Sequence, residues 1–312
     1  MARTILALSN ILPAGLEPLE SEFAILRLWK EKDPQAAIQQ RQNDIVAIVA
    51  GPGRTVSRKL IEALPNLEII GVFAVGTDNV DLDAARERGI AVTNTPGVTA
   101  QDTADAAMAL ILCLARRIVE GDAYVRVSKW PNGPLPLGVS LADKTVGIVG
   151  LGAIGAAVAA RAEVFGMTVV YHGPRDKGAA YRFYPQLLEM AQASDFLVLS
   201  CPGGAETRHM VNADILKALG PDGFLINVGR GSIVDEEALL VALRNKSIAG
   251  AGLDVYDNEP YVPEALFSMD NVVLLPHIGS ATAETRGKMA HLVIENIRAH
   301  FRGEPLKTPV AA

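Results

Sequence analysis

The chain has 312 residues, of which 49% are hydrophobic and 21% charged, and its formal net charge is −6. This length exceeds what one hydrophobic core usually serves, so a globular protein of two domains is expected. The acidic balance gives no basic field for nucleic acid or an anionic membrane. The longest apolar window, AAMALILCLA, is about half the length that a bilayer requires, and MARTILALSN does not resemble a signal peptide, so we expect a cytoplasmic protein.

Short apolar runs of β type alternate along the chain with helical patterns. Most of these runs are continuous, which is typical of parallel strands buried on both faces. The alternation of strands and helices predicts an α/β fold. The expected strands lie at residues 3–8, 45–50, 68–73, 90–93, 145–149, 168–172, 195–200, 223–227, 249–253 and 272–275.

One helix, expected from Thr99 to about Glu120, is apolar almost all round and should therefore be buried. The loop after it is rich in Gly and Pro and marks a boundary between four strands and a new run of strands and helices. A last amphipathic helix, expected at 281–302, could return to the first domain. The two cysteines, Cys113 and Cys201, match no metal-ligand spacing, so we expect no metal site.

The segment GLGAIG at 150–155 has the pattern GxGxxG, and it lies between a predicted strand and a predicted helix. Gly150 permits a tight turn, Gly152 lets the backbone approach a pyrophosphate, and Gly155 lets the helix and the strand pack closely. Free N–H groups at the start of the helix would face the phosphates. The predicted dinucleotide loop also includes Leu151, Ala153 and Ile154.

The strand that follows ends in HGPRDK, where the choice between NAD and NADP is usually made. In this fold a carboxylate about 20 residues past the glycines binds the ribose of NAD, and an Arg accommodates the extra phosphate of NADP. Here Gly173 leaves space at the strand end, Arg175 stands at that distance, and Lys177 adds charge. The pattern favours NADPH. If Asp176 reaches the ribose instead, NADH is the coenzyme; His172 could stack on the adenosine.

Three polar segments follow predicted strands in the second half of the chain: NVGRGSIVDE at 227–236, GLDVYDNEP at 252–260 and LLPHIGSAT at 274–282. Ligands bind beyond the carboxyl ends of strands in open parallel sheets, so the polar groups of these segments could converge. Each segment alone has an ordinary structural interpretation. Together they indicate a catalytic site.

These motifs and FAVGTDNVDL at 73–82 resemble, in order and spacing, the D-2-hydroxyacid dehydrogenase family and in particular its glyoxylate/hydroxypyruvate reductases. The resemblance covers nearly the whole chain. It implies two Rossmann-like domains with parallel sheets and an active site in the cleft between them. The substrate domain would be discontinuous and flavodoxin-like, at 1–98 plus 281–312, and the coenzyme domain would be 99–280. A homodimer is also implied, with an arm at about 120–143 that wraps the partner.

The resemblance implies a role for each matching residue. Arg230 would bind the substrate carboxylate and polarise the keto oxygen, and backbone N–H groups of Val75 and Gly76 would take the other side of the carboxylate. His277 would give its proton to the keto oxygen, while Glu259 holds its other ring nitrogen and favours the imidazolium. The other implied contacts are Ser280 with the substrate and, with the coenzyme, Thr103, Cys201, Pro202, Thr207, Val228, Asp254 and Gly279.

The leading hypothesis is an NADPH-preferring reductase that converts small 2-keto acids, such as glyoxylate and hydroxypyruvate, to D-2-hydroxy acids. The stretch FAVG at 73–76 offers no cation for a phosphorylated substrate. One alternative is an NAD-dependent dehydrogenase for another acid, such as 2-ketogluconate, hydroxyphenylpyruvate or phosphoglycerate. Another is a non-enzymatic, corepressor-like dimer that senses NAD(P)H.

Overall fold

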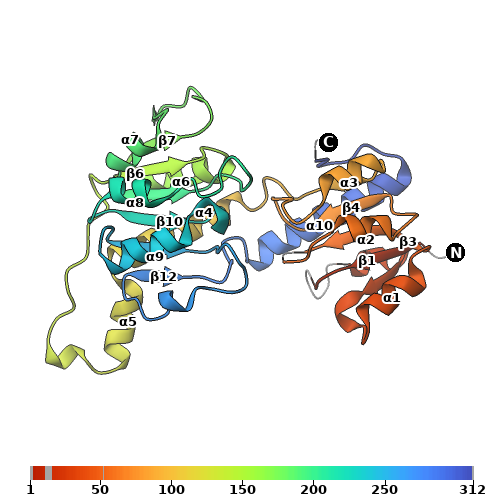
Figure 1. The fold of residues 1–312 in the computed structure, drawn as a ribbon, viewed down its shortest axis with the longest axis horizontal. Coiled ribbons are helices and arrows are strands. Elements are labelled where there is room, and N and C mark those ends of the chain that lie inside the picture. The colour runs from red at the N-terminus through yellow and green to blue at the C-terminus, as the bar shows by residue number, and fades with distance from the viewer. Residues whose placement is uncertain (1–2, 11–15, 52, 311–312) are drawn as a thin grey trace. The chain divides into compact units, whose positions relative to one another are not determined.

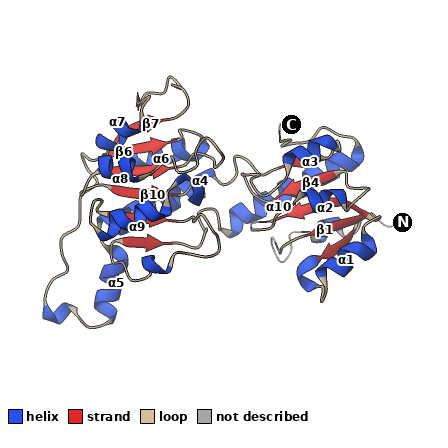
Figure 2. Ribbon diagram, in the orientation of Figure 1, coloured by secondary structure: helices blue, strands red, loops and turns tan. Residues whose placement is uncertain are grey.

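The computed structural model describes residues 3–10, 16–51 and 53–310 (Figures 1 and 2). The chain divides into two compact units: unit 1 comprises residues 1–99 and 281–312, and unit 2 comprises residues 100–280. Each unit is built on a parallel sheet with helices on both faces. The predicted α/β class with two parallel sheets is therefore confirmed. Within the described residues, no helix combines the length and the apolar character needed to cross a membrane.

The sheet of unit 1 has five parallel strands in the order β2-β1-β3-β4-β5, the order of flavodoxin-like sheets. All six residues of the central strand β3 are buried, which explains why its sequence, IVAIVA, is continuously apolar. The strands are β1 (Thr4–Ala7), β2 (Ala24–Arg27), β3 (Ile45–Ala50), β4 (Ile69–Val72) and β5 (Ala91–Thr93).

Successive residues of these strands face opposite sides of the sheet, and different helices cover the two sides. Helix α10 (Ala283–Arg302) buries Met289, Val293 and Ile297 on one side. It begins at Thr282, whose hydroxyl oxygen accepts a hydrogen bond from the N–H of Thr285, and is the helix expected at 281–302. The helices that bury residues on the other side are α1 (Pro34–Arg41), α2 (Arg58–Glu62) and α3 (Leu82–Glu87).

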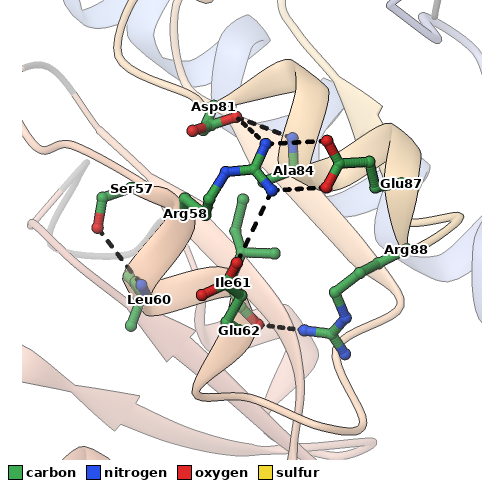
Figure 3. Close-up of polar contacts among 9 residues, drawn as sticks. All are labelled: Ser57, Arg58, Leu60, Ile61, Glu62, Asp81, Ala84, Glu87 and Arg88. Atoms are coloured by element: carbon green, nitrogen blue, oxygen red, sulfur yellow. Dashed lines mark hydrogen bonds and ion pairs between the residues drawn. The ribbon is translucent and has the colours of Figure 1, made fainter.

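Figure 3 shows how charged groups join the short helices α2 and α3. The guanidinium of Arg58 on α2 contacts both carboxylate oxygens of Glu87 on α3, at 2.6 and 3.0 Å. It also lies 3.8 Å from Asp81, whose carboxylate caps α3 by accepting the N–H of Ala84. Arg88 donates to backbone carbonyls at the end of α2, including that of Ile61. Exposed pairs of this kind contribute little each, so we assign this cluster a local structural role.

The sheet of unit 2 has seven parallel strands in the order β12-β11-β10-β9-β6-β7-β8. The chain runs outward from β6 to β8 and then returns to β9, which lies on the other side of β6. Ligands of open parallel sheets bind at the carboxyl ends of strands beside such a reversal. The strands are β6 (Thr145–Val149), β7 (Thr168–His172), β8 (Arg182–Phe183), β9 (Phe196–Leu199), β10 (Phe224–Asn227), β11 (Gly250–Leu253) and β12 (Val272–Leu274).

Two hydrophobic cores cover the two faces of this sheet. Along β9, Phe196 and Val198 belong to the core that contains α4 (Ala100–Ala115) and α6 (Ala153–Val164). Leu197 and Leu199 belong to the other core, which contains α7 (Leu187–Gln192), α8 (Ala213–Leu219) and α9 (Glu236–Arg244). This alternation is that of a strand buried on both faces.

The long helix expected from Thr99 to about Glu120 is interrupted, so that prediction is corrected. Helix α4 ends at Ala115, and the carbonyl of Ala115 accepts the N–H of Val139, at 2.6 Å. Arg117 adopts a left-handed backbone with φ of 53°, which redirects the chain into α5 (Ile118–Arg126). In Figure 1, α5 and the loop after it extend away from the body of unit 2.

All ten predicted strands are present, and two further strands, β2 and β8, were not predicted. Both lie at an edge of their sheet. Only Leu26 is buried in β2, and β8 has two residues, so neither carries the continuous apolar run that identifies the other strands.

Candidate active site

The loops after β11 and β12 bring Glu259 and His277 together at the carboxyl end of the sheet of unit 2. Nδ1 of His277 lies 2.6 Å from Oε2 of Glu259. Oε1 of Glu259 accepts the backbone N–H of Tyr256 at 3.1 Å, so both carboxylate oxygens are engaged. His277 has a φ of 54°, a conformation that few residues other than glycine adopt. The structure thus pairs the two residues that the sequence proposed as acid and orienting carboxylate.

The electrostatics of this pair define which ring nitrogen of His277 can exchange a proton. Burial favours a higher pKa for Glu259, but the hydrogen bond and charge of His277, the N–H of Tyr256 and the charge of Arg230 together hold that pKa below its ordinary value. Glu259 is therefore ionised at neutral pH, and Nδ1 of His277 must donate to it. Nε2 is left to exchange a proton with a ligand or solvent, since the side chain is 44% exposed.

Arg230 stands in the loop after β10, and the residues around it shape that loop. The buried amide of Asn227 donates to the carbonyl of Arg230 at 2.9 Å and accepts the N–H of Gly229 at 3.1 Å. One guanidinium nitrogen of Arg230 donates to the carbonyl of Gly229, at 2.7 Å. A guanidinium has five N–H donors, so others can reach a carboxylate. Asn227 was not among the predicted site residues, although a polar residue that ends a buried apolar strand was a usable signal.

Asp254 holds the loop that carries His277. Its two carboxylate oxygens accept the backbone N–H groups of Ile278, at 2.7 Å, and Gly279, at 2.8 Å. A Cβ on Gly279 would stand 2.8 Å from Oδ2 of Asp254, so only glycine allows this approach. Burial raises the pKa of Asp254, and the two N–H groups oppose that rise. The contact with a nicotinamide predicted for Asp254 stays a prediction.

The three glycines of the GLGAIG segment occupy different surroundings. A Cβ on Gly150, which has a φ of 91°, would stand 2.8 Å from the backbone of Cys201 in the loop after β9. A Cβ on Gly155 would stand 2.3 Å from the carbonyl oxygen of Gly150, at the contact between α6 and β6. Gly152 faces open space at the N-terminus of α6. This arrangement, with two crowded glycines and one open one, fits a pyrophosphate at the helix start.

The loop between β7 and β8 stands beside this glycine loop. Nδ1 of His172 lies 2.9 Å from the carbonyl oxygen of Tyr184, so Nδ1 is the donor there. A Cβ on Gly173 would meet no atom within 4 Å, so the strand end is open. The ammonium of Lys177 donates to the carbonyl of Leu151 at 2.8 Å, which joins the two loops.

The two charged residues before Lys177 differ in their surroundings. Asp176 is turned back toward the sheet, where its Oδ1 accepts the hydroxyl of Tyr171 at 2.5 Å and the N–H of Gly178 at 2.9 Å. The hydrogen bond from Tyr171, assisted by that from Gly178, lowers the pKa of Asp176. Arg175 is exposed, and within the described parts of the chain no residue forms an ion pair or hydrogen bond with its guanidinium.

The other predicted coenzyme residues of unit 2 lie on α4 and in the loops after β9 and β10. Thr103 on α4 is buried, and its methyl group lies 3.5 Å from where a Cβ on Gly279 would stand. The hydroxyl of Thr207 donates to the carbonyl of Pro202 at 2.9 Å. Burial raises the pKa of the Cys201 thiol to about 11, so the thiol is protonated. Val228 is buried, and Ser280 is half-buried at the end of unit 2.

Val75 and Gly76 belong to unit 1, whereas the remaining predicted site residues belong to unit 2. Their contact with the substrate, and an active site between the domains, therefore stay predictions. The stretch FAVG at 73–76 itself contains no cation, but a residue from another element lies close to it. The guanidinium carbon of Arg286, on α10, lies 5.5 Å from the ring centre of Phe73, so a cation does stand beside the stretch FAVG. The sequence could not predict this contact, because the two residues are more than 200 positions apart.

Comparisons of the sequence and of the structure with known proteins agree with one another. Residues 108–279 match the D-isomer specific 2-hydroxyacid dehydrogenase NAD binding domain. The chain is 47% identical to a glyoxylate/hydroxypyruvate reductase A of Arabidopsis thaliana and 46% identical to a hydroxyphenylpyruvate reductase of Plectranthus scutellarioides, over 94% of each chain in both cases. The structure of an NADPH-dependent glyoxylate/hydroxypyruvate reductase of Sinorhizobium meliloti in complex with NADP and malonate is 43% identical, with a TM-score of 0.90 over 100% of this chain and 97% of that one.

Proposed function

We propose, since the chain belongs to the D-isomer specific 2-hydroxyacid dehydrogenase family, that it reduces glyoxylate and hydroxypyruvate to D-2-hydroxy acids and prefers NADPH. The observation that carries the proposal is the pairing of an ionised Glu259 with Nδ1 of His277, because it leaves Nε2 as a proton donor, and the charge of Arg230 also acts on Glu259. Relatives named glyoxylate/hydroxypyruvate reductase support the substrate class.

Different residues of unit 2 have different roles in the proposed reduction. Gly150, Gly152 and Gly155 would hold the coenzyme, which would supply the hydride when bound. Arg230 binds the substrate carboxylate and draws electron density toward the keto oxygen. Nε2 of His277 gives its proton to that oxygen, and Glu259 stabilises the imidazolium beforehand. The neutral imidazole left after the transfer keeps the proton on its own Nδ1, which still donates to Glu259, and takes a new proton from solvent at Nε2.

The position of Asp176 supports the preference for NADPH. A carboxylate at the strand end would hydrogen-bond the ribose of NAD and repel the 2′-phosphate of NADP. Here the carboxylate accepts from Tyr171 and Gly178 instead, and Gly173 leaves the strand end open. Arg175 is exposed, and no residue among those described pairs with its charge. The S. meliloti relative, described as NADPH-dependent, agrees with this preference.

Replacing Arg175 by alanine is expected to weaken NADPH selectively. Hydrogen bonds to a charged group contribute about 1.5–3 kcal/mol, so the Kd for NADPH should rise roughly 10- to 100-fold. The Kd for NADH should stay within about twofold, since NADH has no 2′-phosphate. Fluorescence titration of both coenzymes measures this. Equal losses for the two would mean that Arg175 does not bind the phosphate.

The substrate class is tested by kcat/KM with NADPH for glyoxylate, hydroxypyruvate, hydroxyphenylpyruvate, 2-ketogluconate and 3-phosphohydroxypyruvate. We expect the two small acids to give the highest values. The relative from P. scutellarioides makes hydroxyphenylpyruvate the strongest competitor, and Arg286 beside Phe73 makes a phosphorylated acid a necessary comparison. A higher value for either would replace the proposed substrate. No turnover with any acid would favour a coenzyme sensor.

We also propose that the protein forms a homodimer through the arm at about 120–143 and α5, which overlaps the start of the arm. This segment exposes apolar side chains along a projecting element, as expected of a surface that a partner covers (Figure 1). The exposed apolar residues are Ile118, Val119, Val125, Val127, Trp130 and Leu137.

Leu137→Asp is expected to shift this protein from dimer to monomer. Leu137 is 95% exposed in the single chain, so a charge there costs little unless a partner buries it. Sedimentation velocity at several protein concentrations measures the change. Val164→Asp on α6 is the matched control, since Val164 is 86% exposed and lies outside the arm. If both variants sediment like the wild type, the arm does not form the interface.

A further inference from the structure

The loop between β7 and β8 is folded around one hydroxyl group, that of Tyr171. The ring of Tyr171 is buried and packs against Phe183, with ring centres 5.3 Å apart. Its hydroxyl donates to Oδ1 of Asp176 at 2.5 Å and accepts the backbone N–H of Lys177 at 2.9 Å. The N–H of Gly178 donates to the same Oδ1. Tyr171 thus anchors Asp176 and Lys177 directly, and Gly178 is held through Asp176.

The direction of these hydrogen bonds is unambiguous. Burial, and the hydrogen bond to Asp176, raise the pKa of Tyr171, so the phenol keeps its proton. The pKa of Asp176 is lowered chiefly by the same hydrogen bond, so Asp176 is the acceptor. The result is a negative charge drawn toward the sheet, one residue after Arg175.

The same hydroxyl also helps to place the positive charges of the loop. The backbone of Lys177 is held by Tyr171, and its ammonium reaches the carbonyl of Leu151 in the glycine loop. Arg175 lies two residues earlier in a loop that Gly173, Pro174 and Gly178 shape. Anchoring Asp176 and the backbone of Lys177 therefore restricts where the guanidinium of Arg175 can extend.

We propose that Tyr171 is a positioning residue for coenzyme choice: its hydroxyl withdraws the Asp176 carboxylate, which otherwise could bind the ribose as in NAD-dependent proteins, and so lets Arg175 select a 2′-phosphate. This proposal rests on the proposed preference for NADPH and extends it. It explains how the chain can prefer NADPH although Asp176, an acid that could bind the ribose of NAD, stands next to Arg175. Coenzyme choice then depends on a buried phenol that touches no coenzyme itself.

The test measures binding rather than turnover. Isothermal titration calorimetry gives Kd for adenosine 2′,5′-bisphosphate and for 5′-AMP with the full-length protein, and the ratio of the two reports recognition of the 2′-phosphate. Tyr171→Phe should lower the preference for the bisphosphate about 3- to 10-fold, the effect of losing one hydrogen bond. Adding Asp176→Asn to Tyr171→Phe should restore the preference, since the released side chain then has no charge.

Tyr181→Phe is the matched control, because it removes a hydroxyl from the same loop that donates to Glu163, at 2.9 Å, rather than to Asp176. It should leave the ratio unchanged. Asp176→Asn alone should also stay within about twofold of the wild type, since the amide oxygen still accepts from Tyr171. This variant tests the proposal even if Tyr171→Phe does not fold.

The outcomes separate this proposal from the one on which it rests. A wild type that does not favour the bisphosphate over 5′-AMP overturns the preference for NADPH and the role of Tyr171 with it. A wild type that favours the bisphosphate, with the same ratio in Tyr171→Phe, overturns the role of Tyr171 alone. That role is also overturned if both ligands weaken equally, if the double variant is not restored, or if Asp176→Asn alone increases the preference several-fold.

Discussion

Replacing His277 by asparagine lowers kcat for glyoxylate reduction roughly 10²- to 10⁴-fold, the contribution of a positioned general acid. Asparagine suits the position because it tolerates the φ of 54° better than alanine does, yet it cannot give a proton to the keto oxygen. The N–H groups that hold the loop on Asp254 are backbone groups and remain. Stopped-flow absorbance of the coenzyme measures the rate, and fluorescence titration should show unchanged NADPH affinity.

His291→Asn on α10 is the matched control for this change. His291 is exposed and lies 3.4 Å from Glu295 on the same helix, and it belongs to none of the loops that form the site. Its kcat should equal that of the wild type. If His277→Asn retains wild-type kcat, another group is the acid.

The pH dependence follows from the same pair. Because the pKa of Glu259 lies below its ordinary value, its carboxylate stays ionised through the neutral range, and its support for the imidazolium is lost only as the pH falls through that lowered pKa. Reduction uses the protonated His277, so kcat/KM should fall as the pH rises. The reverse oxidation, which needs the neutral ring as base, should rise.

Arg230→Lys should raise KM for glyoxylate roughly 10- to 100-fold, because an ammonium cannot reproduce the two-point contact and one charge-assisted bond is worth about 1.5–3 kcal/mol. The loop should persist, since the amide of Asn227 bonds the backbone of residues 229 and 230 rather than the guanidinium. Initial rates over a range of glyoxylate, at saturating NADPH, give KM.

Arg244→Lys, at the exposed end of α9, provides the same chemical change outside the site. It should have wild-type KM. A wild-type KM for Arg230→Lys as well would remove Arg230 from substrate binding, and a loss confined to kcat would place its contribution in the transition state alone.

The fold was largely predictable because its strands are buried on both faces. A strand such as β3 has no solvent side, so its apolar run identifies it without tertiary information. Edge strands such as β8 owe their pairing to a neighbour and have no such run. At the end of α4, the carbonyl of Ala115 accepts a hydrogen bond from Val139, which is distant in sequence. A local helical pattern cannot predict such a contact.

In the candidate site too, some features could be predicted from the sequence and others depend on residues that are distant in the chain. His277, Glu259 and Arg230 follow strands in short motifs whose spacing brings them to one edge of the sheet, so sequence order was sufficient to propose them. The sequence left the role of Asp176 open, because the position of a residue in the chain determines neither its side-chain rotamer nor its hydrogen-bond partner. Only the position of Tyr171 beneath the loop shows where that carboxylate points.

The decisive experiment for the proposed coenzyme choice is kcat/KM for glyoxylate with NADPH and with NADH, side by side on the purified wild-type protein. We predict a value at least about tenfold higher with NADPH, since Arg175 gains a charge-assisted contact with the phosphate and Asp176 is withdrawn from it. An equal or higher value with NADH would overturn the proposal. It would mean that Asp176 serves the ribose and that the protein is an NAD-dependent dehydrogenase.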